Sequence, residues 1–366
     1  MITTAPLPEW PHLLRAAAAG RTEPVSPWLR PLDEGWLTAR SCWALAALIR
    51  AVARRIGLPP RVLLPGWICN QSLWPLRQAG AELVFQPVFA DGRADWAAAE
   101  RLGTMDVVVV VHTFGYAVEM DAARDFANRR GALLIEDAAH VLMPGPGIGE
   151  SGDAVVYSPH KLLAAPEVGV LVLRPRAEDW SAEISQSLGT PPAVAPAHRW
   201  LIRRLIQKLI PDSLRSRLPQ GGQGAFLIDP ETVPLPPAVA PSDLARRLLA
   251  SADLPHEAAR RRDNAAALRD VVKATSDLRP LFHSDTAIPY RLALRCASSK
   301  AAAERYAALR RAHLPVESWP DLPPEVTRDP IHAEGAVALR RSVLLLPVYG
   351  ALSPDRLAAA YAKVLR

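Results

Sequence analysis

The sequence predicts an α/β fold, with a large domain on a mostly parallel sheet flanked by helices and a smaller α/β C-terminal domain. Three observations predict it. Short apolar runs recur along the first half of the chain and are continuous rather than alternating, as in strands buried on both faces. Helical patterns lie between several of these runs, which favours parallel strands joined through helices. Beyond about residue 175, Pro- and Gly-rich segments appear before strand and helix patterns return.

The elements of the large domain follow in order. Residues 40–58 form an amphipathic pattern that predicts a helix, with Ser41 at its N-cap and Gly57 near its C-terminal end. A further helix is expected over residues 120–131. The strands are expected at residues 61–65, 82–88, 107–111, 132–136, 154–157 and 168–173.

The second half of the chain is organised differently. Residues 191–196 and 219–241 are typical of linkers or irregular loops. One helix over 242–273 is expected to lead out of the large domain, so we assign residues 1–240 to the large domain and 241–366 to the small one. The small domain is expected to use strands at 290–294 and 343–348 and helices at 299–313 and 354–366.

Residues 198–218 read as a basic amphipathic helix that resembles an insertion. Such a helix is most often a surface or subunit-contact element. Peripheral docking on an anionic membrane surface is the second interpretation.

The composition excludes several classes of protein. Of the 366 residues 49% are apolar, and 43 basic residues face 37 acidic ones, without the basic and aromatic patches of a nucleic-acid binder. Three cysteines form no metal-ligand spacing and fit a reducing compartment. We find neither a signal-peptide pattern nor a run of membrane-spanning length, so the sequence predicts a soluble cytoplasmic protein without a metal site.

Lys161 stands out because it is the only lysine before Lys208 in a chain that otherwise uses arginine. Arginine can replace lysine as a surface charge but cannot lose its proton to form an imine. The position of Lys161 therefore indicates amine chemistry, with chance placement as the alternative.

Asp137 and His140 follow a buried run in the segment IEDAAH, residues 135–140. Ligands of open parallel sheets gather at the carboxyl ends of strands, so a carboxylate there is well placed to act. The alternative is a structural role, since an aspartate after a strand is often a turn residue or helix cap.

Lys161 follows the next strand in VVYSPHKLL, residues 155–163, so one strand-to-strand excursion separates it from Asp137. A lysine amine and a carboxylate in one crevice suit pyridoxal 5'-phosphate (PLP), because the amine forms an imine and the carboxylate keeps the pyridine nitrogen protonated. The phosphate needs N–H groups and hydroxyls at a helix N-terminus, and the helix starting at Arg40, Ser41 and Cys42 offers them.

The chain resembles the DegT/DnrJ/EryC1/StrS (sugar aminotransferase) family of fold-type I PLP-dependent enzymes. The resemblance covers roughly residues 36–175, 242–264 and 336–366. It rests on an ordered series: LPGWICNQS, QAGAELVF, VVHTFGYAVEMD, IEDAAH, IGESGDAVVYSPHKLL and LLLPVYGALSP. The glycines of residues 145–152 are then a turn before a strand and not a dinucleotide-binding loop.

The resemblance implies a role for each matching residue. Lys161 would be the Schiff-base lysine and proton shuttle, Asp137 would pair with the pyridine nitrogen, and His140 would lie beside the phenolic oxygen of the cofactor. The remaining residues implied to bind the cofactor are Ser41, Cys42 and Ser158 at the phosphate, and Trp67 or Cys69 over the ring, with Cys69 aligning more directly.

The sequence also departs from the family pattern. Val156 stands where the family usually has a serine that contacts the phosphate, and Ser158 would take over that contact. The loop that commonly reaches the partner subunit is replaced by PLPPAVAPSD at 234–243, and Tyr349 replaces the histidine of the C-terminal motif. These changes leave the Lys161–Asp137 chemistry intact but weaken the case for an ordinary nucleotide-linked keto-sugar as substrate.

Three functions remain open from the sequence. The first is an aminotransferase that moves an amino group from an amino-acid donor to a keto-sugar or related ketone or aldehyde, in polysaccharide or natural-product biosynthesis. The second is a PLP-dependent lyase or dehydratase on the same scaffold, and the third is a non-catalytic scaffold. The resemblance also implies a homodimer.

Overall fold

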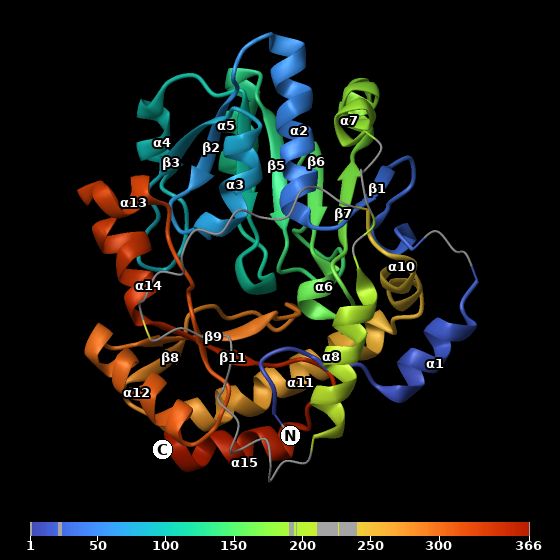
Figure 1. The fold of residues 1–366 in the computed structure, drawn as a ribbon. Coiled ribbons are helices and arrows are strands. Elements are labelled where there is room, and N and C mark those ends of the chain that lie inside the picture. The colour runs from blue at the N-terminus through green and yellow to red at the C-terminus, as the bar shows by residue number, and fades with distance from the viewer. Residues whose placement is uncertain are drawn as a thin grey trace.

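The fold consists of two sheets with their covering helices (Figure 1). This computed structural model describes residues 2–20, 24–189, 194, 196–210, 226 and 240–365. A seven-stranded sheet occupies the larger part and a four-stranded sheet the smaller, C-terminal part. The predicted α/β fold class is confirmed.

The seven-stranded sheet has the order β1-β7-β6-β5-β4-β2-β3. The strands from β2 to β6 are parallel to their neighbours, and β7 is antiparallel to both β6 and β1. The strands are β1 Glu34–Thr38, β2 Arg61–Pro65, β3 Glu82–Gln86, β4 Val107–Val111, β5 Leu133–Ala138, β6 Ala154–Tyr157 and β7 Gly169–Leu173. The sequence predicted all of them except β1, whose residues alternate weakly and pair only at one edge.

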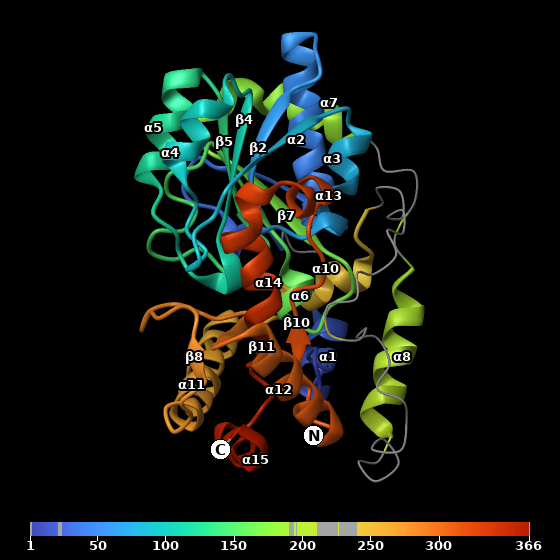
Figure 2. The same cartoon turned by 90° about the vertical axis from the view of Figure 1, so that its left-hand side faces the viewer.

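Helices cover both faces of this sheet, as the edge-on view of Figure 2 shows. On one side α2 and α7 pack against the sheet, and on the other side α4 and α5 do. The helices of this part are α1 Trp10–Ala18, α2 Ser41–Ile56, α3 Trp74–Gln78, α4 Trp96–Ala99, α5 Asp121–Arg130, α6 Pro159–Leu162, α7 Ser181–Leu188, α8 Ala197–Leu209 and α10 Asp243–Ala250.

Side chains of β5 alternate between the two faces, as the pleat of a strand requires. Leu133 and Ile135 belong to the core shared with α2, whereas Leu134 belongs to the core under α5. The same alternation directs Asp137 to the α2 side and Glu136 to the opposite side.

The smaller sheet is antiparallel throughout, in the order β10-β11-β9-β8. Its core combines the strands with three long helices, α11, α12 and α15. The elements are β8 Leu278–Pro280, β9 Arg291–Cys296, β10 Glu317–Ser318, β11 Val343–Pro347, α11 Leu254–Val272, α12 Ser299–Arg311, α13 Pro324–Arg328, α14 Ala338–Ser342 and α15 Pro354–Leu365.

Two local predictions need correction. The helix expected over 242–273 is broken at residues 251–253, where Asp253 caps the second helix by accepting a hydrogen bond from His256 N at 3.0 Å. The N-cap of α2 is Arg40, and Ser41 is the first helical residue. An extended Arg40 leaves the first N–H groups of α2 free of helical partners.

The region around the predicted domain boundary is partly described. α10 packs on α1 and on the core beside β6 and β7, and the boundary near residue 240 stays a prediction. Of the predicted 198–218 helix, α8 is described up to Leu209, and residues 211–218 lie outside the described part, as do most of 191–196 and 219–241.

In the described ranges, no helix has the length and apolar character needed to cross a membrane.

Candidate active site

Asp137 lies near the carboxyl end of β5, in register with Val111 of β4 and Val156 of β6. Its carboxylate accepts one hydrogen bond, from Ala139 N at 2.9 Å, and the side chain keeps part of its exposure. Burial raises the pKa of this carboxyl, and the positive charge of Lys161 acts against that rise. A carboxylate with free acceptor capacity at this edge can take a further donor.

Lys161 follows β6 through the single-turn helix α6. Pro159 opens that turn with a fixed φ, and Lys161 N donates to Ser158 O at 3.0 Å. Among the residues that the structure describes, the Lys161 ammonium makes no hydrogen bond or ion pair, and it is partly exposed. The titrating groups on which its charge acts are Cys42, Cys69, Asp137, His140 and His160.

These electrostatic contacts bring together residues from distant parts of the sequence. Cys42, Asp137 and Lys161, predicted to form one site, surround a common region at the sheet edge. Burial raises the pKa of the Cys42 thiol to about 11 and that of Cys69 to about 12. Both shifts favour the protonated thiol over the thiolate.

The N-terminus of α2 adjoins the turn that carries Lys161. Ser158 Oγ donates to Ser41 Oγ at 2.8 Å, and both side chains are buried. Gly169 of β7 permits the approach, because a Cβ there would lie 2.7 Å from Ser41 N and 2.7 Å from Thr38 Oγ1. Two hydroxyls and the first N–H groups of a 16-residue helix converge here, which is the donor set that an anion such as a phosphate requires.

His140 lies between two aromatic rings. Its ring is stacked on Tyr290, with centroids 4.7 Å apart, and on Phe114, with centroids 5.6 Å apart. Burial lowers the pKa of His140 well below its usual value, and the charges of Lys161 and Arg291 lower it further. Nδ1 accepts from Phe114 N at 3.3 Å, so the neutral ring carries its proton on Nε2.

Trp67 and Cys69 occupy different environments. Trp67 is 2% exposed and packs in an aromatic cluster, with its ring centroid 4.8 Å from Trp319 and 5.8 Å from Phe114. Cys69 lies within the electrostatic reach of Lys161. The structure thus brings Cys69 to the group around Lys161, while Trp67 contacts that group through other rings.

Two residues that hold this arrangement had no signal in the sequence. Asp321 of the C-terminal part accepts from Asn70 N at 3.0 Å and Gln71 N at 3.2 Å, and so fixes the Cys69 segment. Arg261 of α11 is fully buried and donates to Leu162 O at 2.7 Å, directly after Lys161. Both residues act through contacts with distant parts of the chain, which periodicity and motif spacing do not reveal.

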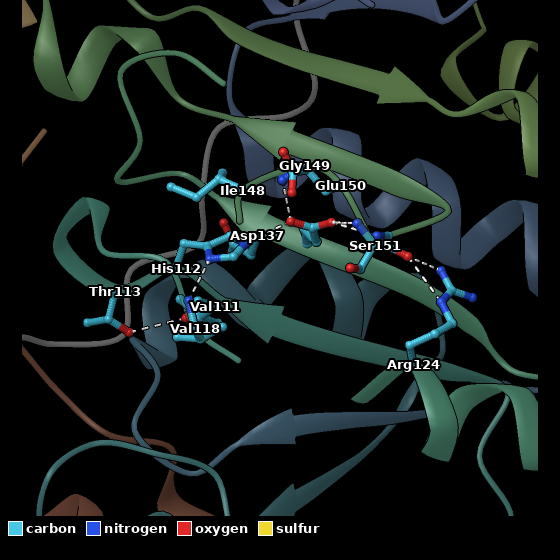
Figure 3. Close-up of polar contacts among 12 residues, drawn as sticks. Val111, His112, Thr113, Val118, Arg124, Asp137, Ile148, Gly149, Glu150 and Ser151 are labelled. Atoms are coloured by element: carbon cyan, nitrogen blue, oxygen red, sulfur yellow. Dashed lines mark hydrogen bonds and ion pairs between the residues drawn. The ribbon is translucent and has the colours of Figure 1, made fainter. Parts of the chain in front are cut away.

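Sequence reasoning also missed Glu136, whose partners His112, Gly149 and Ser151 are labelled in Figure 3. Its carboxylate accepts from His112 Nε2 at 2.7 Å and from the backbone N–H groups of Gly149, Ser151 and Gly152. Burial alone would raise the pKa of Glu136, but His112 and these amides together lower it. The glycine-rich segment 145–152 therefore folds onto an internal carboxylate and forms the turn before β6, as predicted.

Comparison with known proteins adds an independent line of evidence. The model of the DegT/DnrJ/EryC1/StrS aminotransferase family matches residues 77–196, which include Asp137, His140, Ser158 and Lys161. The family resemblance is confirmed over that segment. No curated protein sequence matches the chain.

Solved structures extend the likeness of fold to the whole chain. The aminotransferase TlmJ from Streptoalloteichus hindustanus is 20% identical with a TM-score of 0.70, covering 100% of this chain and 98% of that chain. 3-Amino-5-hydroxybenzoic acid synthase is 18% identical with a TM-score of 0.67, over 99% and 98%. The PLP form of Spr1654 from Streptococcus pneumoniae is 16% identical with a TM-score of 0.66, over 100% of both chains. At these identities the likeness establishes the fold, and the predicted fold-type I architecture is confirmed.

Proposed function

We propose that this protein is a PLP-dependent aminotransferase with Lys161 as the residue that binds the cofactor. The observation that carries the proposal is the Lys161 ammonium, which has no hydrogen-bond or ion-pair partner among the described residues and acts electrostatically on Asp137, at the sheet edge next to the N-terminus of α2. The match to an aminotransferase family model over the same residues supports it.

The residues present fit the chemistry of the cofactor. Ser41, Ser158 and the first N–H groups of α2 would hold the phosphate, at a place where Gly169 leaves room for the approach. Asp137 has unused acceptor capacity for a protonated pyridine nitrogen. When bound, PLP supplies a carbonyl for amine exchange and an electron sink for the bond-breaking step.

The protein's own groups would then do the following work. Lys161 Nζ would remove the α proton of the substrate and return a proton, because its amine shares the sheet edge with Asp137 and has no partner among the described residues. Asp137 would hold its negative charge opposite the ring nitrogen, where the positive charge of Lys161 counteracts the rise in its pKa caused by burial. His140, neutral because of its lowered pKa, would donate from Nε2 to the phenolic oxygen.

The substrates we propose are an amino-acid donor and a keto-sugar or related ketone or aldehyde acceptor. The family match supports this class, as do the aminotransferase TlmJ and the putative sugar aminotransferase Spr1654 among the similar structures. The cofactor roles of Cys42, Trp67 and Cys69, the homodimer and the cytoplasmic location stay predictions.

A half-reaction tests the proposal and separates it from elimination. Protein loaded with PLP and freed of excess cofactor is mixed with L-glutamate without an acceptor. We expect about one equivalent of 2-oxoglutarate per subunit and then no more, since ping-pong transfer stops at the aminated cofactor. Continuous release of a dehydrated product from an added hydroxy substrate would instead establish a lyase, and failure to bind PLP would exclude both enzymes.

A matched pair of variants controls for non-specific imine formation. Lys161→Ala should form no 2-oxoglutarate, whereas Lys273→Ala, which removes an exposed lysine paired with Asp270, should behave as the wild type. Equal loss in both variants would contradict the assignment of Lys161.

A further inference from the structure

The helix α8 presents aliphatic side chains to solvent. Ile202, Ile206 and Leu209 are 56%, 54% and 69% exposed, and none of the residues of α8 is buried. Their spacing of four and three residues places them on one side of the helix. A surface helix of a globular protein normally turns its apolar residues toward the core. Trp200, Leu201 and Leu205 of α8 are half-buried, but this aliphatic stripe is left on the outside.

Contacts on the opposite side of α8 fix this orientation. Trp200 packs against the core that contains β6, β7 and α10. Arg204 is half-buried and lies within the electrostatic reach of Tyr349 in the C-terminal part. Lys208 Nζ lies 5.7 Å from the ring centroid of Trp10 in α1. These three residues are four apart, so they hold one side inward and leave the aliphatic side outward.

The helix α1 extends the apolar surface. Trp10 and Leu14, one helical turn apart, are 50% and 71% exposed. Both views show α1 and α8 next to each other, and the contact between Lys208 and Trp10 joins them (Figures 1 and 2). We call the set of five exposed side chains the α1–α8 face; they are Trp10, Leu14, Ile202, Ile206 and Leu209.

Basic residues border this face. Arg199 and Arg203 are exposed on α8 and Arg15 on α1, while α8 contains no Asp or Glu. Among the described residues, the acidic side chains near α1 are Glu9, which precedes it, and Asp253 and Glu257, which line a pocket together with Arg15. Two copies packed through α8 would bring arginines together without partners from α8. An anionic surface complements both the charge and the apolar stripe.

We propose that the α1–α8 face docks on an anionic lipid bilayer, with α8 lying in the plane of the membrane interface. Aliphatic side chains flanked by arginines are the pattern of helices that bind in this way, and an exposed tryptophan favours the headgroup level. The enzyme would then work beside the membrane, so an acceptor linked to a lipid becomes accessible to it.

Cosedimentation of the full-length holoprotein with vesicles tests this inference. We expect binding to phosphatidylcholine vesicles that contain about a quarter phosphatidylglycerol, weakening with added salt, and little binding to phosphatidylcholine alone. Arg199→Gln with Arg203→Gln should weaken binding by about fivefold per arginine. Ile202→Ser with Ile206→Ser should weaken it by about tenfold or more.

Control variants keep the outcomes distinct. Ile331→Ser and Arg311→Gln change exposed residues of the C-terminal part and should bind vesicles as the wild type does. Ile202→Leu with Ile206→Leu keeps aliphatic side chains at both positions and should retain the binding that the serine variant loses. Absence of wild-type binding to the anionic vesicles would overturn the proposal, as would undiminished binding of the serine variant. A lower mass of the serine variant in lipid-free sedimentation equilibrium would instead assign the face to a second copy.

Discussion

Glu136 and Asp137 are neighbours in β5 but lie in two regions of different character, one on each side of the large sheet. The Glu136 carboxylate is fully buried and accepts from His112 and from three backbone N–H groups. The Asp137 carboxylate keeps part of its exposure, accepts from Ala139 N, and faces the charge of Lys161.

The difference separates a structural carboxylate from the one that we propose to contact the cofactor. Glu136 accepts one hydrogen bond from His112 and three from the turn before β6, and these four fill the acceptor positions of a carboxylate, so none is left for a ligand. Asp137 is held in place by the strand and retains acceptor capacity near the Lys161 amine, which has no partner in the part of the chain that the structure describes. The number of internal hydrogen bonds, more than burial or sequence context, distinguishes the two.

The largest expected effect comes from removing the amine on the Asp137 side. Lys161→Ala should lower turnover by roughly 10⁴-fold, because no other described amine can transfer the proton. Steady-state kinetics measure the loss, and circular dichroism should show an unchanged fold. Residual activity near the wild-type level would refute the role of Lys161.

On the opposite side of the sheet, Glu136→Gln should affect stability. Its amide NH₂, at the place of either oxygen, would face two of the four donors that the carboxylate now accepts from, and the buried negative charge would be lost. The free energy of unfolding should therefore fall by about 3 kcal/mol. Urea denaturation measures the change, and Glu150→Gln, at a half-exposed side chain, is the control. A stability equal to that of the control would break the comparison.

Asp137→Asn should show the reverse pattern. The amide keeps the shape of the carboxylate but loses its charge, so turnover should fall by about 10²-fold while the urea midpoint stays within error. Asp125→Asn, on the exposed side of α5, is the matched control. A large loss of stability in Asp137→Asn would mean that the two carboxylates are alike.

The pH dependence of stability sharpens the description of the active-site side. Burial lowers the pKa of His160 from 6.5 to about 4, and Nδ1 donates to Val168 O at 2.8 Å. As the pH falls, His160 is protonated in the unfolded chain before it is protonated in the folded one. Its contribution to the free energy of unfolding is therefore complete above pH 6.5 and falls by at most about 3 kcal/mol as the pH drops to about 4. Denaturant titrations at several pH values measure this, and the free energy of unfolding should depend less steeply on pH in His160→Gln than in the wild type. Equal pH dependence in the two proteins would contradict this assignment.

The smallest effect concerns the anion end of the site. Ser158→Ala removes the hydrogen bond to Ser41 and should weaken PLP binding by about fivefold, the value of about one hydrogen bond. Fluorescence titration with PLP measures the change. Ser187→Ala, which loses a hydroxyl bonded to Glu183 O within α7, should bind PLP as the wild type; a comparable loss there would make the Ser158 effect non-specific.

Much of this comparison could be predicted from the sequence, for identifiable reasons. Continuous apolar runs specified β2 to β7, and strand ends followed by Asp137 and Lys161 specified the edge where the two meet. The roles of Glu136, Arg261 and Asp321 depend on contacts with residues far away in the chain, which no local pattern encodes. The sequence showed the basic amphipathic character of α8, but only the contacts of Trp200, Arg204 and Lys208 show that its aliphatic side faces outward.

The central claim is that the amine beside Asp137 is the cofactor-binding group. Borohydride reduction of the PLP-loaded protein, followed by peptide mass mapping, tests it most directly. We predict one labelled peptide, carrying the modification on Lys161, and loss of the label in Lys161→Ala. Label on Lys208, Lys273, Lys300 or Lys363 with Lys161 unmodified would contradict the account.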